Sequence, residues 1–212
     1  MATLASATSL KLPEQISSPL AQSTLTLQRF SGSTKELEAI YKTLSNPKLW
    51  EGGYDLSGRL IDITDDKSLR AAIEELWLSE SLELMVIQDG RNFAGVTGVM
   101  DWSCGGDSTW NVLTGRTVIA TDYWGTKVNS ESKVMLYDEI FRLGADQIEC
   151  TVSCTNNRSL AAVQKFGFTE LRQAPKLVDG VLKNFTRFGL PTSRWSNVFA
   201  QNLDRISIKL QS

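Results

Sequence analysis

The feature that most constrains the fold is a succession of strand, loop, helix and strand in the second half of the chain. Residues 109–119 are rich in β-branched side chains, residues 123–129 form a tight loop, and residues 130–143 have helical character. Gly144 follows this helix, as a left-handed C-terminal cap requires. Residues 148–152 hardly alternate between polar and apolar side chains, which predicts a central strand. A β-loop-α-β unit therefore lies in the middle of the fold.

The rest of the chain adds strands that precede this unit and helices on either side of it. The dipeptides Asp89-Gly90 and Asp179-Gly180 are strong hairpin signals. The further expected elements are strands at 23–30, 84–88, 93–102 and 181–188 and helices at 33–49, 67–78, 156–166 and 193–206. This order predicts an α+β fold with a mixed, mostly antiparallel central sheet and helices on both faces.

The domain organisation and partners follow from length and composition. The 212 residues, 42% hydrophobic and 22% charged, suit one domain with a real core, which we place at residues 23–212. Residues 1–22 are rich in Ser, Ala, Thr and Leu and are expected to form a flexible tail. A net charge of −2 favours neither nucleic acid nor an anionic membrane, and we expect no membrane span. The protein is expected to be a monomer or homodimer.

Cysteine and histidine content restricts the chemistry. Cys104, Cys150 and Cys154 cannot all pair, which suits a reducing compartment such as the cytoplasm. With no histidine in the chain, a zinc site would lack ligands, so no metal is expected. Histidine-dependent hydrolytic triads are also excluded. Catalysis must rely on carboxylates, hydroxyls, thiols, amines, backbone dipoles or water.

The loop from Trp124 to Asn129 lies between a predicted strand and a predicted helix. Its glycine lets the backbone approach a ligand closely, and free N–H groups at a helix start attract phosphate. It matches neither the Walker pattern nor the Rossmann pattern. On spacing alone, a phosphate site and an ordinary turn both remain open.

Two motifs resemble a known family. The segments WGTKVNSESK and NNRSLAAVQKFGF resemble signatures of the GNAT superfamily of N-acetyltransferases, in its Rim-type branch. The likeness spans about residues 23–205. It implies direct transfer of the acetyl group of acetyl-CoA to a primary amine, namely the α-amino group of a protein N-terminus. The alternatives are a small amino-acid-like metabolite or antibiotic as the acceptor, or a catalytically silent module that binds acetyl-CoA.

The resemblance also assigns residues. In this family two neighbouring parallel strands splay apart, and the cofactor inserts between them. One strand pairs with pantetheine, the following loop holds the pyrophosphate, and an asparagine on the next helix contacts pantetheine. The matching residues here are Thr117, Val118 and Ile119 for the strand, Trp124, Gly125, Thr126, Lys127, Val128 and Asn129 for the loop, and Asn156 with Ser159 for the helix.

The chain departs from the family pattern at three places. Lys127 replaces a usual glycine, which either adds charge near phosphate or constrains the loop. Asn129 replaces glycine or alanine, although asparagine tolerates left-handed backbone. Val163 stands where many family members carry the tyrosine that protonates the departing thiolate. Ser159 is the substitute acid that the resemblance suggests; its alternative role is a cap or a hydrogen bond to CoA.

Candidates for the base and for the acceptor pocket have ordinary structural roles as alternatives. Asp101 and Glu149 are candidate general bases, since a weak base suffices for an α-amine; either could instead be solvated or salt-bridged. Three tryptophans could line a substrate pocket or pack in the core. They are Trp50, Trp102 and Trp110.

Overall fold

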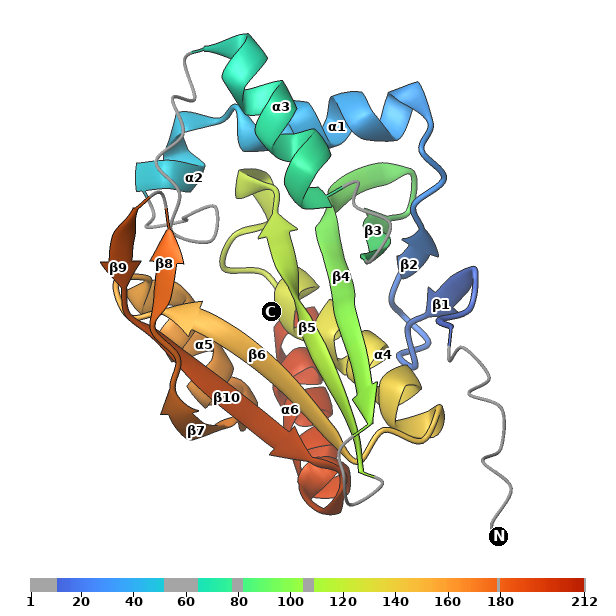
Figure 1. Ribbon diagram of the computed structural model, residues 1–212. Helices are drawn as coiled ribbons and strands as arrows, with labels where there is room; N and C mark the ends of the chain where they lie inside the picture. The colour runs from blue at the N-terminus through green and yellow to red at the C-terminus, as the bar shows by residue number, and fades with distance from the viewer. Residues whose placement is uncertain (1–10, 52–64, 78–81, 105–108, 179, 212) are drawn as a thin grey trace, which may run out of the picture.

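The computed structural model describes residues 11–51, 65–77, 82–104, 109–178 and 180–211. Its centre is an eight-stranded sheet with a separate two-stranded ribbon at one side (Figure 1). The sheet contains β1 (Gln15–Ser17), β2 (Leu25–Arg29), β3 (Glu83–Asp89), β4 (Asn92–Cys104), β5 (Trp110–Ile119), β6 (Gln147–Ser153), β7 (Thr169–Gln173) and β10 (Phe185–Pro191), and the ribbon contains β8 (Lys176–Val178) and β9 (Val181–Lys183). The helices are α1 (Thr34–Leu44), α2 (Pro47–Glu51), α3 (Asp66–Trp77), α4 (Val128–Arg142), α5 (Asn157–Phe166) and α6 (Thr192–Gln211), with a 3₁₀ turn, η1 (Thr121–Tyr123).

The strands of the large sheet lie in the order β1-β2-β3-β4-β5-β6-β10-β7. Every neighbouring pair is antiparallel except β5 and β6, which are parallel. Helix α4 connects these two strands and returns the chain to the end of the sheet where β5 began. The sheet is therefore mixed and mostly antiparallel, as predicted, and β6 lies inside it.

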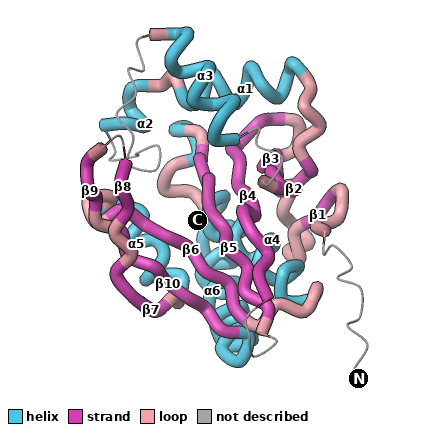
Figure 2. The backbone as a smooth tube through the Cα atoms, viewed as in Figure 1, coloured by secondary structure: helices cyan, strands magenta, loops and turns pink. Residues whose placement is uncertain are grey.

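Alternate strand residues contribute to two separate hydrophobic cores. One core lies under α1 and α3 and includes Ile40, Leu69 and Val118. The other lies under α4, α5 and α6 and includes Met135 and Ile148. Figure 2 shows α1, α2 and α3 together at the top of the view and the other helices below them. Helices cover both faces, which confirms the predicted architecture. Within the described ranges, each helix is too short or too polar to span a bilayer.

An aromatic cluster fixes α5 and α6 against α4. Tyr137 meets Phe166 edge-on at 5.3 Å between ring centroids, and Trp195 stacks on Phe166 at 6.5 Å. The Trp195 indole N–H donates to Asp138 over 2.9 Å. Each such aromatic pair contributes about 0.5–1.5 kcal/mol beyond its area burial. The helices that carry the two sequence motifs are thus held in one unit.

The predicted flexible tail differs from the structure over residues 11–22. Here β1 pairs with β2, Ile16 lying opposite Leu27, and Leu12 is buried. The Leu12 amide donates to Glu83 over 3.0 Å. A strand of three residues is too short for its alternation to stand out in the sequence. Residues 1–10 lie outside the described residues.

Two predicted elements are divided in the structure. The helix expected at 33–49 becomes α1 and α2, because Pro47 disfavours helical backbone at Asn46 and then starts the second helix. The strand expected at 181–188 becomes β9 and β10. Gly180 has the left-handed φ of 76° that a hairpin turn needs, whereas Asp179 and part of the turn expected at 104–107 lie outside the described residues.

Candidate active site

The parallel strands separate soon after they pair. Ladder pairs join Asn111–Leu113 to Gln147–Glu149, and beyond them β5 continues to Ile119 and β6 to Ser153. The Thr114 hydroxyl donates to the Glu149 carbonyl over 3.2 Å just past these pairs. We call the unpaired stretch beyond them the splay. It matches the separated strand pair that the family resemblance implies.

Bulges between β4 and β5 bend the second strand at the splay. The register of the β4–β5 pair shifts between Val96 and Gly98 and again between Val99 and Asp101. The first shift places an extra residue in β5 beside Arg116, whose φ of 53° lies in the left-handed region. Bulges bend a strand, and they are common next to active sites. Backbone of this kind costs energy and persists where surrounding structure imposes it.

The end of β5 presents backbone groups to the splay. The Ala120 amide donates to the Ala94 carbonyl over 2.9 Å. The alternation of an antiparallel ladder therefore turns the amide and carbonyl of Ile119 away from β4, toward the side of β6. The Ile119 carbonyl accepts the Trp124 indole N–H over 2.9 Å. The tryptophan of the loop motif thus fixes the strand on which the loop begins.

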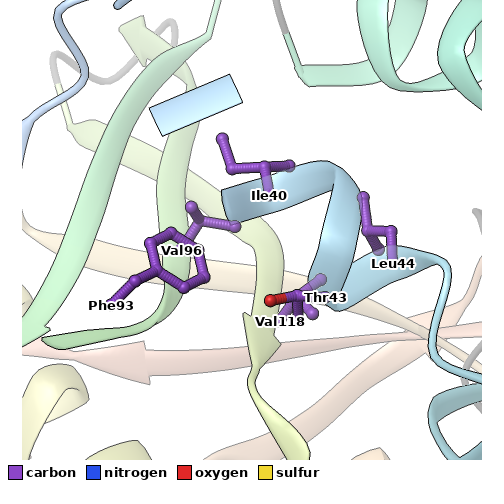
Figure 3. Close-up of a pocket in the computed structure, with 6 residues that line it drawn as sticks. All are labelled: Ile40, Thr43, Leu44, Phe93, Val96 and Val118. Atoms are coloured by element: carbon purple, nitrogen blue, oxygen red, sulfur yellow. The ribbon is translucent and has the colours of Figure 1, made fainter. Parts of the chain in front are cut away.

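The side chain of Val118 packs β5 against the core that lies under α1 and α3. The same side chain contributes to an apolar gap under α1 that has no room for a water molecule (Figure 3). The other lining residues are Ile40, Thr43, Leu44, Phe93 and Val96. The apolar side chains around this gap belong to the core and pack β5 against α1. The backbone of Ile119, one residue further on, faces the splay.

The loop after β5 leads directly into the N-terminus of α4. Gly125 has a φ of 77°, and the Thr126 hydroxyl donates to the Tyr123 carbonyl over 2.7 Å. Val128 and Asn129 are already helical, so Asn129 does not adopt the left-handed backbone that its side chain would tolerate. The N-cap residue makes no side-chain cap. First-turn amides and the positive end of the helix dipole therefore meet the loop, where they favour an anion.

Lys127 constrains the loop, which is one of its two predicted roles. Its ammonium pairs with Glu131 over 2.9 Å and donates to Ser23 over 2.9 Å. Glu131 is fully buried and accepts a hydrogen bond from Ser18 over 2.5 Å. The lysine charge is therefore directed toward the N-terminal segment and neutralised there.

The two sequence motifs meet in space. The guanidinium of Arg158, in the first turn of α5, stacks on the Trp124 ring at 3.5 Å from its centroid. A cation over an indole face gains about 0.5–2 kcal/mol, depending on burial. This contact brings the loop before α4 beside the N-terminus of α5.

Asn156 and Ser159 lie together at the start of α5. Asn156 is the N-cap, and its Oδ1 accepts from the Ser159 amide over 3.0 Å. The cap leaves the Asn156 amide nitrogen to serve a ligand. Val163, at the predicted acid position, is partly buried against the core.

Replacing Asn156 by Asp separates capping from ligand binding. The carboxylate keeps an oxygen for the cap but loses the N–H donor, so CoA affinity is expected to fall about two- to tenfold, the worth of one hydrogen bond. Thermal unfolding should be unchanged, whereas Asn156→Ala should also lose about 1 kcal/mol of stability with the cap. Calorimetry and thermal melts check both. Wild-type affinity in the Asp variant would remove Asn156 from the cofactor site.

The two candidate carboxylates flank one residue of β5. Asp101 lies opposite Leu113 in β4, and Glu149 lies opposite Leu113 in β6. Side chains in one row share a face, and two strand spacings separate them by roughly 10 Å. Asp101 is exposed, whereas Glu149 is paired with Arg187 over 2.5 Å and accepts from Gln147 over 2.7 Å. Glu149 is therefore salt-bridged, which is the alternative role stated for it in the sequence analysis. To act as a base, it would have to accept a proton while it stays paired with Arg187.

The tryptophans mainly support the fold. Trp50 donates to the Leu44 carbonyl over 2.7 Å, and Trp102 donates to Glu83 over 3.2 Å. Both also pack against the hydrophobic cores, while Trp110 is partly buried outside them. Core packing, the alternative stated for them, therefore accounts for Trp50 and Trp102.

The buried cysteine of β6, Cys150, is not an activated nucleophile. Burial raises the pKa of Cys150 to about 12, which keeps that thiol protonated. All three cysteines are thiols and not half of a disulfide, with Cys104 exposed and Cys154 partly buried.

Sequence reasoning missed three cations at the site. Lys133 reaches the bulge of β5, Arg158 stacks on the loop, and Lys209 donates from the end of α6 to the Gly125 carbonyl over 3.0 Å. Lys133 and Arg158 lie inside the two quoted motifs, which marked their positions but not the contacts that they make in the folded chain. Lys209 had none, because its contact depends on how α6 crosses the molecule.

Comparison with known proteins agrees with this geometry. The chain is similar to a protein from T. thermophilus assigned as an acetyltransferase (21% identity, 92% of this chain and 98% of that one, TM-score 0.70). It is also similar to Mycobacterium smegmatis RimJ solved with CoA-disulfide (16%, 86% and 89%, 0.64). A third likeness is to a spermidine N-acetyltransferase chimera of Vibrio cholerae SpeG and hSSAT (16%, 82% and 99%, 0.57).

No curated protein matches the chain. Residues 24–169, however, match the acetyltransferase (GNAT) domain family, and this range contains the bulged strand, the loop and both motif helices. Members of that family transfer an acetyl group from acetyl-CoA. The chain therefore belongs to the GNAT family of acetyltransferases.

Proposed function

We propose that this acetyltransferase moves the acetyl group of acetyl-CoA directly to a primary α-amino group, with a protein N-terminus as acceptor. The observation that carries this proposal is the splay, with the α4 N-terminus and the Arg158–Trp124 stack beside it. That arrangement offers backbone groups for an extended ligand and a positive end for its phosphates.

The cofactor would lie along β5 and between α4 and α5. The loop Trp124–Asn129 would hold the pyrophosphate, and the backbone from Thr117 to Ile119 would pair with pantetheine and the thioester. Asn156 would add a side-chain donor, and Ser159 is the residue that the family resemblance nominates near the sulfur.

Direct transfer suits the side chains that are present. The amine must be neutral to attack, and backbone donors must stabilise the tetrahedral oxyanion. With a pKa near ~8, an α-amine is partly neutral at pH 7, so a weak base such as Asp101 or Glu149 acting through water suffices. The protonated Cys150 thiol argues against an acetyl-cysteine intermediate.

The second candidate acceptor is a small molecule, since one structural neighbour is a spermidine N-acetyltransferase. A polyamine would require acidic surroundings. Glu149 is already paired with Arg187 over 2.5 Å, so its charge is not available to a polyamine. This favours an acceptor that carries fewer positive charges.

Release of free CoA tests the proposal. The protein should release CoA from acetyl-CoA in the presence of peptides with free N-termini, and mass spectrometry should find the acetyl group on the terminal nitrogen. Activity only with polyamines or amino-acid-like compounds would favour the small-molecule reading. Calorimetric CoA binding without turnover on any amine would identify a silent acetyl-CoA-binding module.

A further inference from the structure

Lys133 is a cation at the splay that the mechanism above does not use. It lies in the second turn of α4, and its ammonium donates to Thr117 Oγ1 over 2.5 Å and to Thr97 Oγ1 over 3.0 Å. The two hydroxyls are 2.8 Å from each other. Thr117 belongs to the bulge of β5, so the lysine nitrogen sits under the strand assigned to the thioester.

In the part of the chain that the structure describes, no fixed negative charge lies beside Lys133. The Cys150 thiol of β6 is close enough for its charge to act on the lysine, and the Tyr137 ring of α4 lies 5.4 Å from the ammonium. Burial raises the pKa values of both groups, so both are neutral near pH 7. In β10 and β6, Arg187 and Glu149 neutralise each other. Among the described residues, Lys133 forms no ion pair with a carboxylate.

Burial also lowers the pKa of Lys133, which makes its ammonium a better proton donor. Desolvation lowers the pKa of Lys133 from its ordinary value to about 8. The cysteine thiol, an alkyl thiol like that of CoA, has a pKa of about 8.5. An ammonium and a thiolate matched in this way exchange a proton with little cost in either direction.

We propose that Lys133 is the general acid that protonates the departing CoA thiolate. The proposal rests on the acetyltransferase function proposed above. In the tetrahedral intermediate the C–S bond breaks, its electron pair goes to sulfur, and the carbonyl forms again. The lysine ammonium gives its proton to sulfur and becomes a neutral amine. The acceptor nitrogen loses its proton to solvent, and solvent then protonates Lys133 again.

Lys133 fits this role better than Ser159. A serine hydroxyl is a poor proton donor near neutrality unless another group assists it, whereas the lysine carries a proton of suitable pKa. The side chain at position 163 is valine and cannot supply a proton. Ser159 can still donate a hydrogen bond to the sulfur, so its variant is the natural comparison.

The test compares four variants of the full chain. Lys133→Met removes the acid, and Lys133→Arg keeps the charge with a pKa too high for proton transfer. Ser159→Ala tests the rival, and Arg142→Met removes an exposed cation from the far end of the same helix. We expect both Lys133 variants to bind CoA in calorimetry and to lose roughly 100-fold in kcat. We expect Arg142→Met to behave as wild type.

The pH profile separates catalysis from structure. Wild-type activity should fall as pH rises through about 8, because the acid must be protonated, and the Lys133 variants should lack this descending limb. Full activity in Lys133→Met or rescue of kcat by Lys133→Arg would overturn the proposal. So would a roughly 100-fold loss of kcat in the Lys133 variants that leaves the descending limb of the pH profile in place. Hydrolysis of acetyl-CoA without any amine expels the same thiolate, so it tests Lys133 even if no α-amine is an acceptor. Wild-type protein inert toward both amines and water would overturn both proposals.

Discussion

Gly125→Val is expected to weaken CoA binding by about 100-fold or more while the domain stays folded. Gly125 has a φ of 77°, and a Cβ at this position would meet no atom within 4 Å. The defect would therefore come from backbone conformation and not from a clash. Strain of about 1–3 kcal/mol per such residue is enough to shift the loop out of the geometry proposed to bind the pyrophosphate, and the amides that the loop presents would then be lost as a group.

Calorimetry with CoA measures this effect, and Gly32→Val is its matched control. Gly32 has a φ of 75° and equally open surroundings, but it precedes α1, in a different loop from the one before α4. Both variants should lose similar stability in thermal melts, and only Gly125→Val should lose affinity. Undiminished CoA affinity in Gly125→Val would mean that this loop does not hold the pyrophosphate.

Acetylation of an α-amine is expected to exceed that of a lysine side chain by roughly a few hundredfold in kcat/KM at pH 7. The pKa values of ~8 and ~10.4 leave neutral fractions that differ by about this factor. The chain contains no histidine, and Glu149 is held by Arg187, so no strong base is present in the described site to offset the difference. The rate with the α-amine should rise with pH up to about 8.

A peptide with a free N-terminus and its N-blocked, lysine-containing twin make the comparison direct. Their sequences are otherwise identical, so binding differences stay small and the ratio reports the reacting nitrogen. Equal or greater activity on the blocked peptide would contradict the α-amine assignment and point to a site that lowers the pKa of a lysine.

The part of the fold that sequence could predict is the part encoded locally. The hairpin at Asp89-Gly90 and the glycine ends of α4 and α5 follow from turn chemistry and periodicity. The splayed strand pair was implied by the resemblance of the two motifs to the GNAT family. The strand β1 was missed because its three residues gain order only by pairing with β2. The division of α1 from α2 could have been read from Pro47.

The candidate site also has residues that the sequence could identify and residues that only the folded structure shows. The loop and Asn156 stand in motifs, so their residues could be named in advance. The role of Lys133 could not, because its pKa depends on burial under β5, which no local pattern reports. The Arg158–Trp124 stack and the engagement of Glu149 by Arg187 also depend on elements that only the folded chain brings together.

The splay has a consequence for the cohesion of the molecule. In the described strands, three ladder pairs connect β5 to β6, so this junction holds the two halves of the sheet less firmly than its neighbours do. A cofactor bound there would supply hydrogen bonds to both halves. A ligand that binds only the folded chain stabilises it by about 2.7 kcal/mol at one hundred times its Kd. Resistance of the chain to proteolysis would then rise and fall with the acetyl-CoA supply, so the abundance of the enzyme would follow that of its own donor.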